Sequence, residues 1–506
     1  MLRKKRISYN KPCEELECIP TTLTTSKAFK TLFALDKQVT RNIRSSHIET
    51  RPVDSNGLWC CALIPAILIS YSVAYKVSPL YKLVAFLGFG LLCYSILFSL
   101  FLYMSTLILY SKLNAGCIVS MLLSTVPIYV YTDFGLAMAL VFSVLAVYPY
   151  SMLLKLALVQ CPRTFTVGEA MIMCQSVVLF IVTGVAIYYT EFVTPELLAK
   201  DNEMTFIAIY VYTVLSTVGL IVTALYFLQD EDKNLKVLGI IFAFGAVFAL
   251  TVLHLCLGKT CLPDFVYYII GSQVRLHLFT MWSVLVVLTV LVLMYHTEAG
   301  DKATTSARKA YHILGALVFL TGILNDVPFM VLASGISAGI IILLEALRLS
   351  RIEPISAALQ AAFDIYCDEK DCGVLAMTPI YLYFGLACPL ALVPWRGSKM
   401  ELELMSGVLA TGIGDTAASW FGHRYGVNYW PGSSRTMEGT AFNVGLQMVA
   451  VYFLHLFEWL DAPHWVVRTG VAAAVSALVE AQTQQVDNVV LPLVSLLALQ
   501  ATSFLA

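Results

Sequence analysis

The sequence predicts an all-α fold, that of a polytopic integral membrane protein with about 15 transmembrane helices, in a range of about 13 to 16. Of its 506 residues, 59% are hydrophobic and only 13% are charged, and the mean hydropathy is +0.78. No soluble fold has enough interior to bury that much apolar surface. From about residue 58 onward, apolar runs of bilayer-spanning length follow one another with short polar breaks.

The composition also argues against a nucleic-acid partner and against a structural zinc site. A net charge of -1 argues against a nucleic-acid partner, which requires a concentrated basic surface. The 13 cysteines are scattered, several of them inside apolar runs, and they form no paired CxxC framework. We therefore interpret them as small buried hydrophobic residues rather than as ligands of a structural zinc ion.

Residues 1–56 differ from the rest and predict a polar, cytosolic and partly disordered N-terminal tail. They lack the apolar core and the small-residue cleavage site of a secretory signal. The basic cluster Lys4-Lys5-Arg6 either fixes the membrane topology as a solvated terminus or contacts anionic lipid.

Residues 57–300 predict a transmembrane scaffold, and residues 301–506 a second transmembrane region with functional loops. Spans are expected at 58–75, 83–110, 115–131, 134–154, 167–189, 204–228, 235–257, 276–296, 311–324, 327–347, 375–394, 402–422, 441–460, 466–479 and 489–506. Two of these, 311–324 and 466–479, are short enough to be half-buried or re-entrant.

The distribution of basic residues predicts a cytosolic N-terminus. In that orientation most lysines and arginines fall in cytosolic loops. The exceptions are Lys76, Lys82, Lys259, Arg275, Arg396 and Lys399. The polar loops of the C-terminal region would then face cytosolic nucleotides.

Few charged residues lie within the spans of the 57–300 region. Glu169 falls at the cytosolic edge of one span, where it is either a carboxylate in the first turn of a helix, a member of a structural ion pair, or catalytic. No internal repeat is evident, which argues against a transporter built from inverted halves.

Polar residues cluster from residue 301 onward. Two cations and His312 begin one helix, in Arg308-Lys309-Ala310-Tyr311-His312. At the end of the next, Glu345 and Arg348 have the spacing of an i,i+3 ion pair. The segment 363–373 is acidic around Lys370, and it is either a solvated loop or part of a site.

Residues 411–426 combine a small-residue membrane helix with one acid. On an α-helix, Thr411, Asp415, Ala418 and Gly422 would share one face, which allows close approach of another helix or a ligand. A carboxylate at the centre of a membrane helix costs roughly 2.5–3.5 kcal/mol on insertion scales. Asp415 is therefore expected to have a partner, either a cationic residue or a metal ion.

Two further segments carry groups that bind polyphosphates and metals. The loop 430–440 offers glycine-rich backbone, hydroxyl side chains and Arg435, and these are groups that phosphates bind, although the chain has no Walker A motif. In the segment 479–492, Glu480, Gln484 and Asp487 form a polar stripe on a helix. Its acids are placed to share a Mg²⁺ ion with Asp415.

Taken together, these motifs resemble the dolichol kinase family, and more distantly phytol kinases and CDP-diacylglycerol synthases. The resemblance covers about residues 300–500, with Phe165-Thr166-Val167-Gly168-Glu169 upstream. Where the family shows two lysines before Thr-x-Glu-Gly, this chain has Ser434 and Arg435. The matching motifs are Arg308-Lys309…His312, Glu345-x-x-Arg348, Asp368-Glu369-Lys370-Asp371, Gly414-Asp415-Thr416-Ala417-Ala418-Ser419, Trp430-Pro431-Gly432…Arg435-Thr436-x-Glu438-Gly439-Thr440 and Glu480…Asp487-Asn488.

The resemblance implies CTP-dependent transfer of phosphate to dolichol or another polyprenol at the cytosolic face of the endoplasmic reticulum membrane. The products would be CDP and dolichyl phosphate, which supports protein glycosylation. The expected residues are Asp415, Lys370 and Glu438 for catalysis; Trp430, Pro431, Gly432, Ser433, Ser434, Arg435, Thr436, Glu438, Gly439 and Thr440 for CTP; and Asp415, Glu480 and Asp487 for a divalent cation, Mg²⁺.

Two other functions remain open from the sequence. A cytidylyltransferase would use similar groups, but a lipid phosphate would attack the α-phosphate of CTP and release pyrophosphate. A non-enzymatic lipid transporter is compatible with the number of spans alone. The oligomeric state, the polyprenol length and the choice of CTP over ATP are also open.

Overall fold

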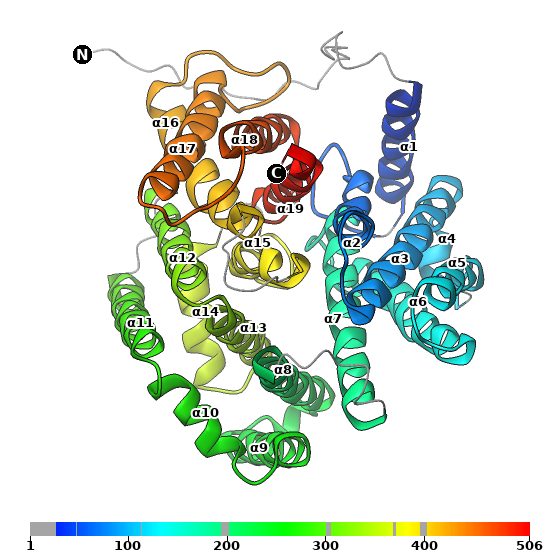
Figure 1. The fold of residues 1–506 in the computed structure, drawn as a ribbon. Helices are drawn as coiled ribbons and strands as arrows, with labels where there is room; N and C mark the ends of the chain where they lie inside the picture. Colours follow the sequence, from blue (N-terminus) through cyan, green and yellow to red (C-terminus); the bar gives the residue numbers. More distant parts are fainter. Residues whose placement is uncertain are drawn as a thin grey trace.

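The computed structural model describes residues 27–46, 48–112, 114–193, 202–299, 305–367, 371–394 and 402–505. Regular secondary structure in these residues is helical, which confirms the predicted all-α class (Figure 1). The α-helices are α1 (Lys27–Arg44), α2 (Leu63–Ala74), α3 (Pro79–Met104), α4 (Leu107–Tyr110), α5 (Cys117–Tyr131), α6 (Leu136–Gln160), α7 (Val167–Val193), α8 (Asn202–Phe227), α9 (Leu235–Leu257), α10 (Cys261–Ile270), α11 (Gln273–Ala299), α12 (Thr305–Asn325), α13 (Val327–Leu349), α14 (Ile355–Tyr366), α15 (Met377–Leu392), α16 (Thr416–Tyr425), α17 (Met437–Leu456), α18 (Trp465–Gln482) and α19 (Asp487–Ala501). Shorter 3₁₀ and π segments are η1 (Leu58–Ala62), η2 (Asp230–Asp232), η3 (Leu402–Met405), η4 (Val408–Asp415) and η5 (Ser503–Leu505).

Eight helices within the described ranges are long and apolar enough to cross a membrane, namely α3, α6, α7, α8, α9, α11, α13 and α17. The chain is therefore a multi-pass membrane protein, but the predicted count of about 15 spans is not confirmed. Several predicted spans coincide with shorter apolar helices, such as α5, α15 and α19. Others, including α12 and α18, carry charged side chains within the helix.

The segment predicted as a partly disordered tail contains a folded helix, α1. Val39 and Ile43 are buried on one side of it. The Asn42 amide donates to the carbonyl oxygens of Leu102 and Tyr103, at 2.9 and 2.8 Å, and so covers the end of α3. The predicted division of the chain into regions at residues 56 and 300 is not tested and remains a prediction.

Three groups of helices follow one another along the chain (Figure 1). In the view shown, α1–α7 lie on the right, α8–α11 with α13 and α14 lie toward the bottom, and α16–α19 lie at the upper left with α15 below them. Helix α19 packs against α15 and α18 and also against α2, so the C-terminal group directly contacts the N-terminal group.

The predicted span 402–422 is helical, but it is not α-helical throughout. It consists of η3, then the eight-residue π-helix η4, and then α16. Glycine has a low preference for the α-helix, so packing with neighbours determines the conformation of this glycine-rich stretch. The neighbours are close: a Cβ on Gly407 would lie 2.4 Å from the carbonyl oxygen of Gly385 in α15. Short π-helical segments occur frequently at functional sites.

Candidate active site

Asp415 lies at the junction of η4 and α16, and it is 3% exposed. Two glycines allow neighbouring helices to approach η4. A Cβ on Gly412 would lie 2.3 Å from Cβ of Ala316 in α12, and one on Gly414 would lie 2.5 Å from Oδ1 of Asn443 in α17. The small residues of this segment therefore serve helix packing and hold Asp415 between α12 and α17. Thr411 and Asp415 are both buried, although η4 is π-helical rather than α-helical as assumed.

The partner expected for Asp415 is Lys309 of α12. Its ammonium group lies 2.5 Å from Oδ2 of Asp415. One turn further along α12, Nε2 of His312 lies 3.8 Å from the same oxygen and 3.2 Å from Oδ1 of Asn488. A carboxylate this deeply buried needs such a cation, because desolvation otherwise disfavours its charged form.

The second cation, Arg435, belongs to the loop between α16 and α17. Its Nη2 lies 2.6 Å from Oδ2 of Asp487 at the start of α19, and its Nη1 lies 3.9 Å from Oε1 of Glu480 at the end of α18. The Asp487 carboxylate raises the pKa of the Arg435 guanidinium above its ordinary value. Arg435 therefore remains charged while it joins the loop to the two C-terminal acids.

Two amide side chains of α17 hold Glu480 in place. Asn443 donates to Oε2 of Glu480 at 2.6 Å, and Gln447 donates to Oδ1 of Asn443, also at 2.6 Å. The other carboxylate oxygen of Glu480, Oε1, is buried and accepts no hydrogen bond from the described residues. Such an atom requires a partner in the working protein, for which a metal ion, a water molecule or a ligand would serve.

The loop 427–436 is closed by backbone contacts. An isolated bridge pairs Tyr429 with Thr436, and the Thr436 hydroxyl caps α17 by accepting from the Gly439 amide. Glu438 accepts hydrogen bonds from the backbone amides of Val427 and Asn428 and from the Asn428 side chain. Glu438 therefore shapes the loop.

The structure brings together four of the predicted residues: Asp415, Arg435, Glu480 and Asp487, which are near enough to interact electrostatically. Trp430 supports the loop through a 2.9 Å hydrogen bond from its indole to the Thr440 hydroxyl. Of the tip residues, Pro431, Gly432 and Ser434 are exposed and Ser433 is half-buried. Lys370 lies outside the described residues.

Some side chains at the site were not among those expected there from the sequence. These are Lys309, His312, Asn443, Gln447 and Asn488. One signal was available for the two residues of α17: an Asn and a Gln four residues apart in an otherwise apolar helix indicate a polar partner inside the bundle.

The donor set fits a divalent cation that is shared with phosphate oxygens. In the part of the chain that the structure describes, no group of three or more His, Cys, Asp or Glu side chains could hold a metal ion by itself. Magnesium commonly takes one or two carboxylates and completes its shell with phosphate oxygens and water. The carboxylates near Lys309 and Arg435 are suited to binding a magnesium ion that is also coordinated by phosphate oxygens.

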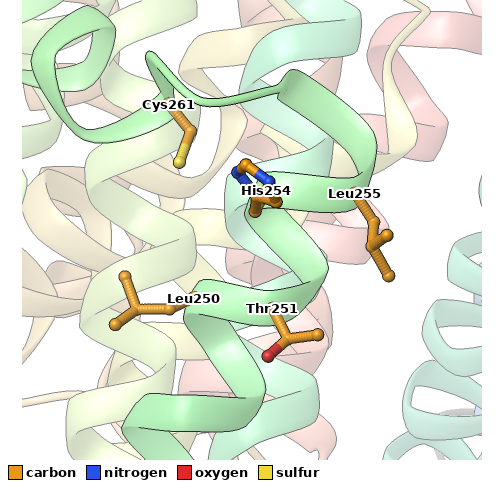
Figure 2. A pocket seen from close by; sticks show the side chains of 5 residues that line it. All are labelled: Leu250, Thr251, His254, Leu255 and Cys261. Carbon is orange, nitrogen blue, oxygen red and sulfur yellow. The ribbon is translucent and has the colours of Figure 1, made fainter.

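A pocket of about 380 Å³ lies elsewhere, at the end of α9 (Figure 2). It is lined by Leu250, Thr251, His254, Leu255 and Cys261. None of the residues around Asp415 belongs to it, so it is not part of this site.

Comparison with known proteins identifies the family. A sequence model described as dolichol kinase matches residues 82–426, more than half of the chain. The chain belongs to the dolichol kinase family. The match includes Lys309, His312 and Asp415, and it ends before the loop that carries Arg435.

Named dolichol kinases are similar to this chain. The protein from Homo sapiens is 29% identical over 366 residues, 67% of this chain. A dolichol kinase from Arabidopsis thaliana is 33% identical over 229 residues, covering 44% of this chain and 39% of its own length, and that from Saccharomyces cerevisiae is 28% identical over 259 residues, 50% of this chain and 48% of its own length. This chain spans 66% of the human dolichol kinase, slightly less than two thirds. No solved structure matches.

Proposed function

We propose that this protein catalyses the CTP-dependent phosphorylation of dolichol and yields dolichyl phosphate and CDP. The observation that supports this most is the meeting of Lys309 and Arg435 with three carboxylates where membrane helices end in a polar loop. A polyprenol stays in the bilayer while its terminal hydroxyl meets a water-soluble nucleotide, and this reaction requires a site at such a boundary. The names of the similar proteins agree with this substrate.

In the proposed reaction, the hydroxyl oxygen of dolichol attacks the γ-phosphorus of CTP. The bond between that phosphorus and the β,γ-bridging oxygen breaks, and CDP leaves with the bonding electrons. The hydroxyl proton passes to Asp415. Phosphoryl transfer depends mainly on positioning and charge neutralisation, which Lys309 and Arg435 supply. Lys309 exchanges its contact with Asp415 for a phosphate oxygen, which leaves the carboxylate able to accept the proton.

A bound Mg²⁺ ion would neutralise charge on the transferred phosphoryl group. Glu480 and Asp487 would hold it together with phosphate oxygens, since Asp415 accepts the proton. The residues 430–436 and 438–440 would surround the nucleotide, with Glu438 fixing the backbone of 427–428 rather than touching the reacting atoms.

The localisation and topology complete the proposal. The active site faces the cytosol from the endoplasmic reticulum membrane, where its product is used in protein glycosylation. The eight longer helices cross the bilayer together with α2, α5, α12, α15, α18, α19 and the segment 402–422, which gives about 15 spans.

The test is a competition experiment with the purified protein in detergent. CTP, ATP, GTP and UTP compete for phosphorylation of labelled dolichol in the presence of Mg²⁺, and the nucleotide product is separated by chromatography. We expect CTP to be the effective competitor, CDP to be the product, and chelation of Mg²⁺ to stop the reaction. Release of pyrophosphate would identify a cytidylyltransferase instead. Lipid movement in vesicles with no nucleotide chemistry would identify a transporter.

A further inference from the structure

The short loop 483–486 connects Glu480 of α18 to Asp487 of α19, and residues from the distant N-terminal half hold it. Arg51 donates from Nη2 to the carbonyl oxygen of Gln484 at 3.0 Å. The backbone amide of Val486 donates to Oε1 of Glu169 at 2.9 Å. Two backbone groups of the loop are therefore fixed by charged side chains that lie more than 300 residues away in the sequence.

Arg51 and Glu169 form a buried ion pair. They are 5% and 0% exposed, and Arg51 Nη2 lies 2.5 Å from Oε1 of Glu169. Arg51 Nε and the backbone amide of Thr166 both donate to the second carboxylate oxygen, at 3.2 and 2.9 Å. Each charge therefore has several partners, as a buried pair requires.

Side chains of the loop make further contacts with the same N-terminal segments. The Thr166 hydroxyl donates to Oε1 of Gln485 at 2.5 Å, and Nε2 of Gln485 donates to the carbonyl oxygen of Ser55 at 2.9 Å. Gly57 permits this approach, because it has a φ of +64° and a Cβ there would lie 2.4 Å from Cδ of Gln485. Three consecutive loop residues thus have their positions set by residues 51–57 and 165–169.

A buried ion pair is weak evidence for stability, because apolar replacements are often neutral or stabilising. Here the pair lies directly behind the loop that joins two acids of the active site. We propose that Glu169 and Arg51 are positioning residues of the active site: they hold loop 483–486, and through it Asp487, where its carboxylate meets Arg435. The inference rests on the function proposed above.

The experiment compares Glu169→Gln with the wild-type protein in detergent. Mutation of a residue that orients a ligand-binding side chain, without itself touching the ligand, typically changes affinity or activity about 10- to 100-fold. We expect the KM for CTP to rise about tenfold, with a change in kcat below about threefold. Amide hydrogen exchange over residues 484–488 should also become at least about tenfold faster. Equilibrium binding of CTP should weaken by the same factor as KM rises.

Two control variants separate positioning from general stability. Arg468→Gln breaks another buried ion pair, with Glu403, at the opposite end of α18 from Glu480. It should lower thermal stability and leave the KM for CTP and the exchange of 484–488 unchanged. Glu49→Gln breaks an exposed pair with Arg163 that joins the same N-terminal segments, and it should change neither quantity.

If Glu169→Gln does not fold, Thr166→Val carries the test, because it removes the contact to Gln485 without leaving an unpaired charge. The proposal is overturned if the folded variant exchanges residues 484–488 and binds CTP as the wild type does. It is also overturned if Arg468→Gln raises the KM equally. Failure of the proposed function is a separate outcome: dolichol would not be phosphorylated by the wild type, while hydrogen exchange would still report on the loop.

Discussion

At the scale of single residues, the site combines three carboxylates with different surroundings. Asp415 faces Lys309, Asp487 faces Arg435, and Glu480 is held by the amide of Asn443. Each acid therefore has a fixed position before any substrate binds, which is the preorganisation that the proposed phosphoryl transfer would require.

Replacing Asp415 with Asn tests its role directly. The amide oxygen can still accept a hydrogen bond from Lys309, so the fold should be retained. An amide, however, binds a cation or a proton more weakly than a carboxylate does. We expect dolichol phosphorylation to fall at least about a hundredfold at an unchanged protein level. Asp264→Asn, in the exposed first turn of α10, is the control and should retain wild-type activity. Full activity of Asp415→Asn would remove Asp415 from the mechanism.

Arg435→Lys keeps the charge but loses the planar group that reaches both Asp487 and Glu480. We expect the KM for CTP to rise about tenfold, equivalent to about 1.4 kcal/mol of binding. The double variant S434K/R435K recreates the pair of lysines found in the resembling family, and it should recover part of that loss. An R435K enzyme with the wild-type KM would show that Arg435 does not contact the nucleotide.

At the scale of elements, apolar runs predicted most helices well, because a bilayer-spanning run has few alternatives. The π-helical part of the span 402–422 was not predicted, since hydropathy does not distinguish α-, π- and 3₁₀-helices. Glu480 and Asp487 were predicted from their helical spacing and from the resemblance to the dolichol kinase family. Lys309 was noticed as part of a cationic segment, but its contact with Asp415 depends on how α12 packs against η4, which one sequence does not reveal.

Helix α17 packs so closely against η4 that we expect a side chain at the position of Gly414 to be unfavourable. In Gly414→Ala the new methyl group would lie 2.5 Å from Oδ1 of Asn443 and 2.7 Å from Nε2 of Gln447, the two amides that hold Glu480. We expect a loss of roughly 1–3 kcal/mol in stability and a fall in activity. Gly445→Ala in the same α17 has open space at its Cβ, and it should gain up to about 1 kcal/mol from helix propensity. Thermal unfolding in detergent distinguishes the two, and equal effects would contradict the packing argument.

At the scale of the whole molecule, the N-terminal group does more than surround the site. Tyr81 of α3 donates to the carbonyl oxygen of Leu392 in α15 at 2.6 Å, and α2 packs against α19. The sequence predicted a scaffold there from the scarcity of intramembrane charges. That interpretation remains untested as a domain boundary. Of the alternatives left open for Glu169, the structure shows both the first turn of a helix and an ion pair.

The proposed topology can be tested by cysteine labelling of sealed microsomes. Ser433→Cys, near the tip of the candidate nucleotide loop, should react with a membrane-impermeant maleimide in intact vesicles. Thr260→Cys, between α9 and α10, should react only after detergent is added. Background labelling is reduced by replacing Cys13, Cys18, Cys367 and Cys372 with Ser. The reverse pattern would invert the orientation and place the site in the lumen.

The contact between Arg51 and Gln484 joins residues 433 positions apart in the chain. Contacts between such distant residues form late in folding, because a long loop must close first. Until residues 484–486 arrive, Arg51 and Glu169 lack several of the groups that cover them. A chain that stops short of residue 484 therefore exposes a charged pair where two helix groups should meet.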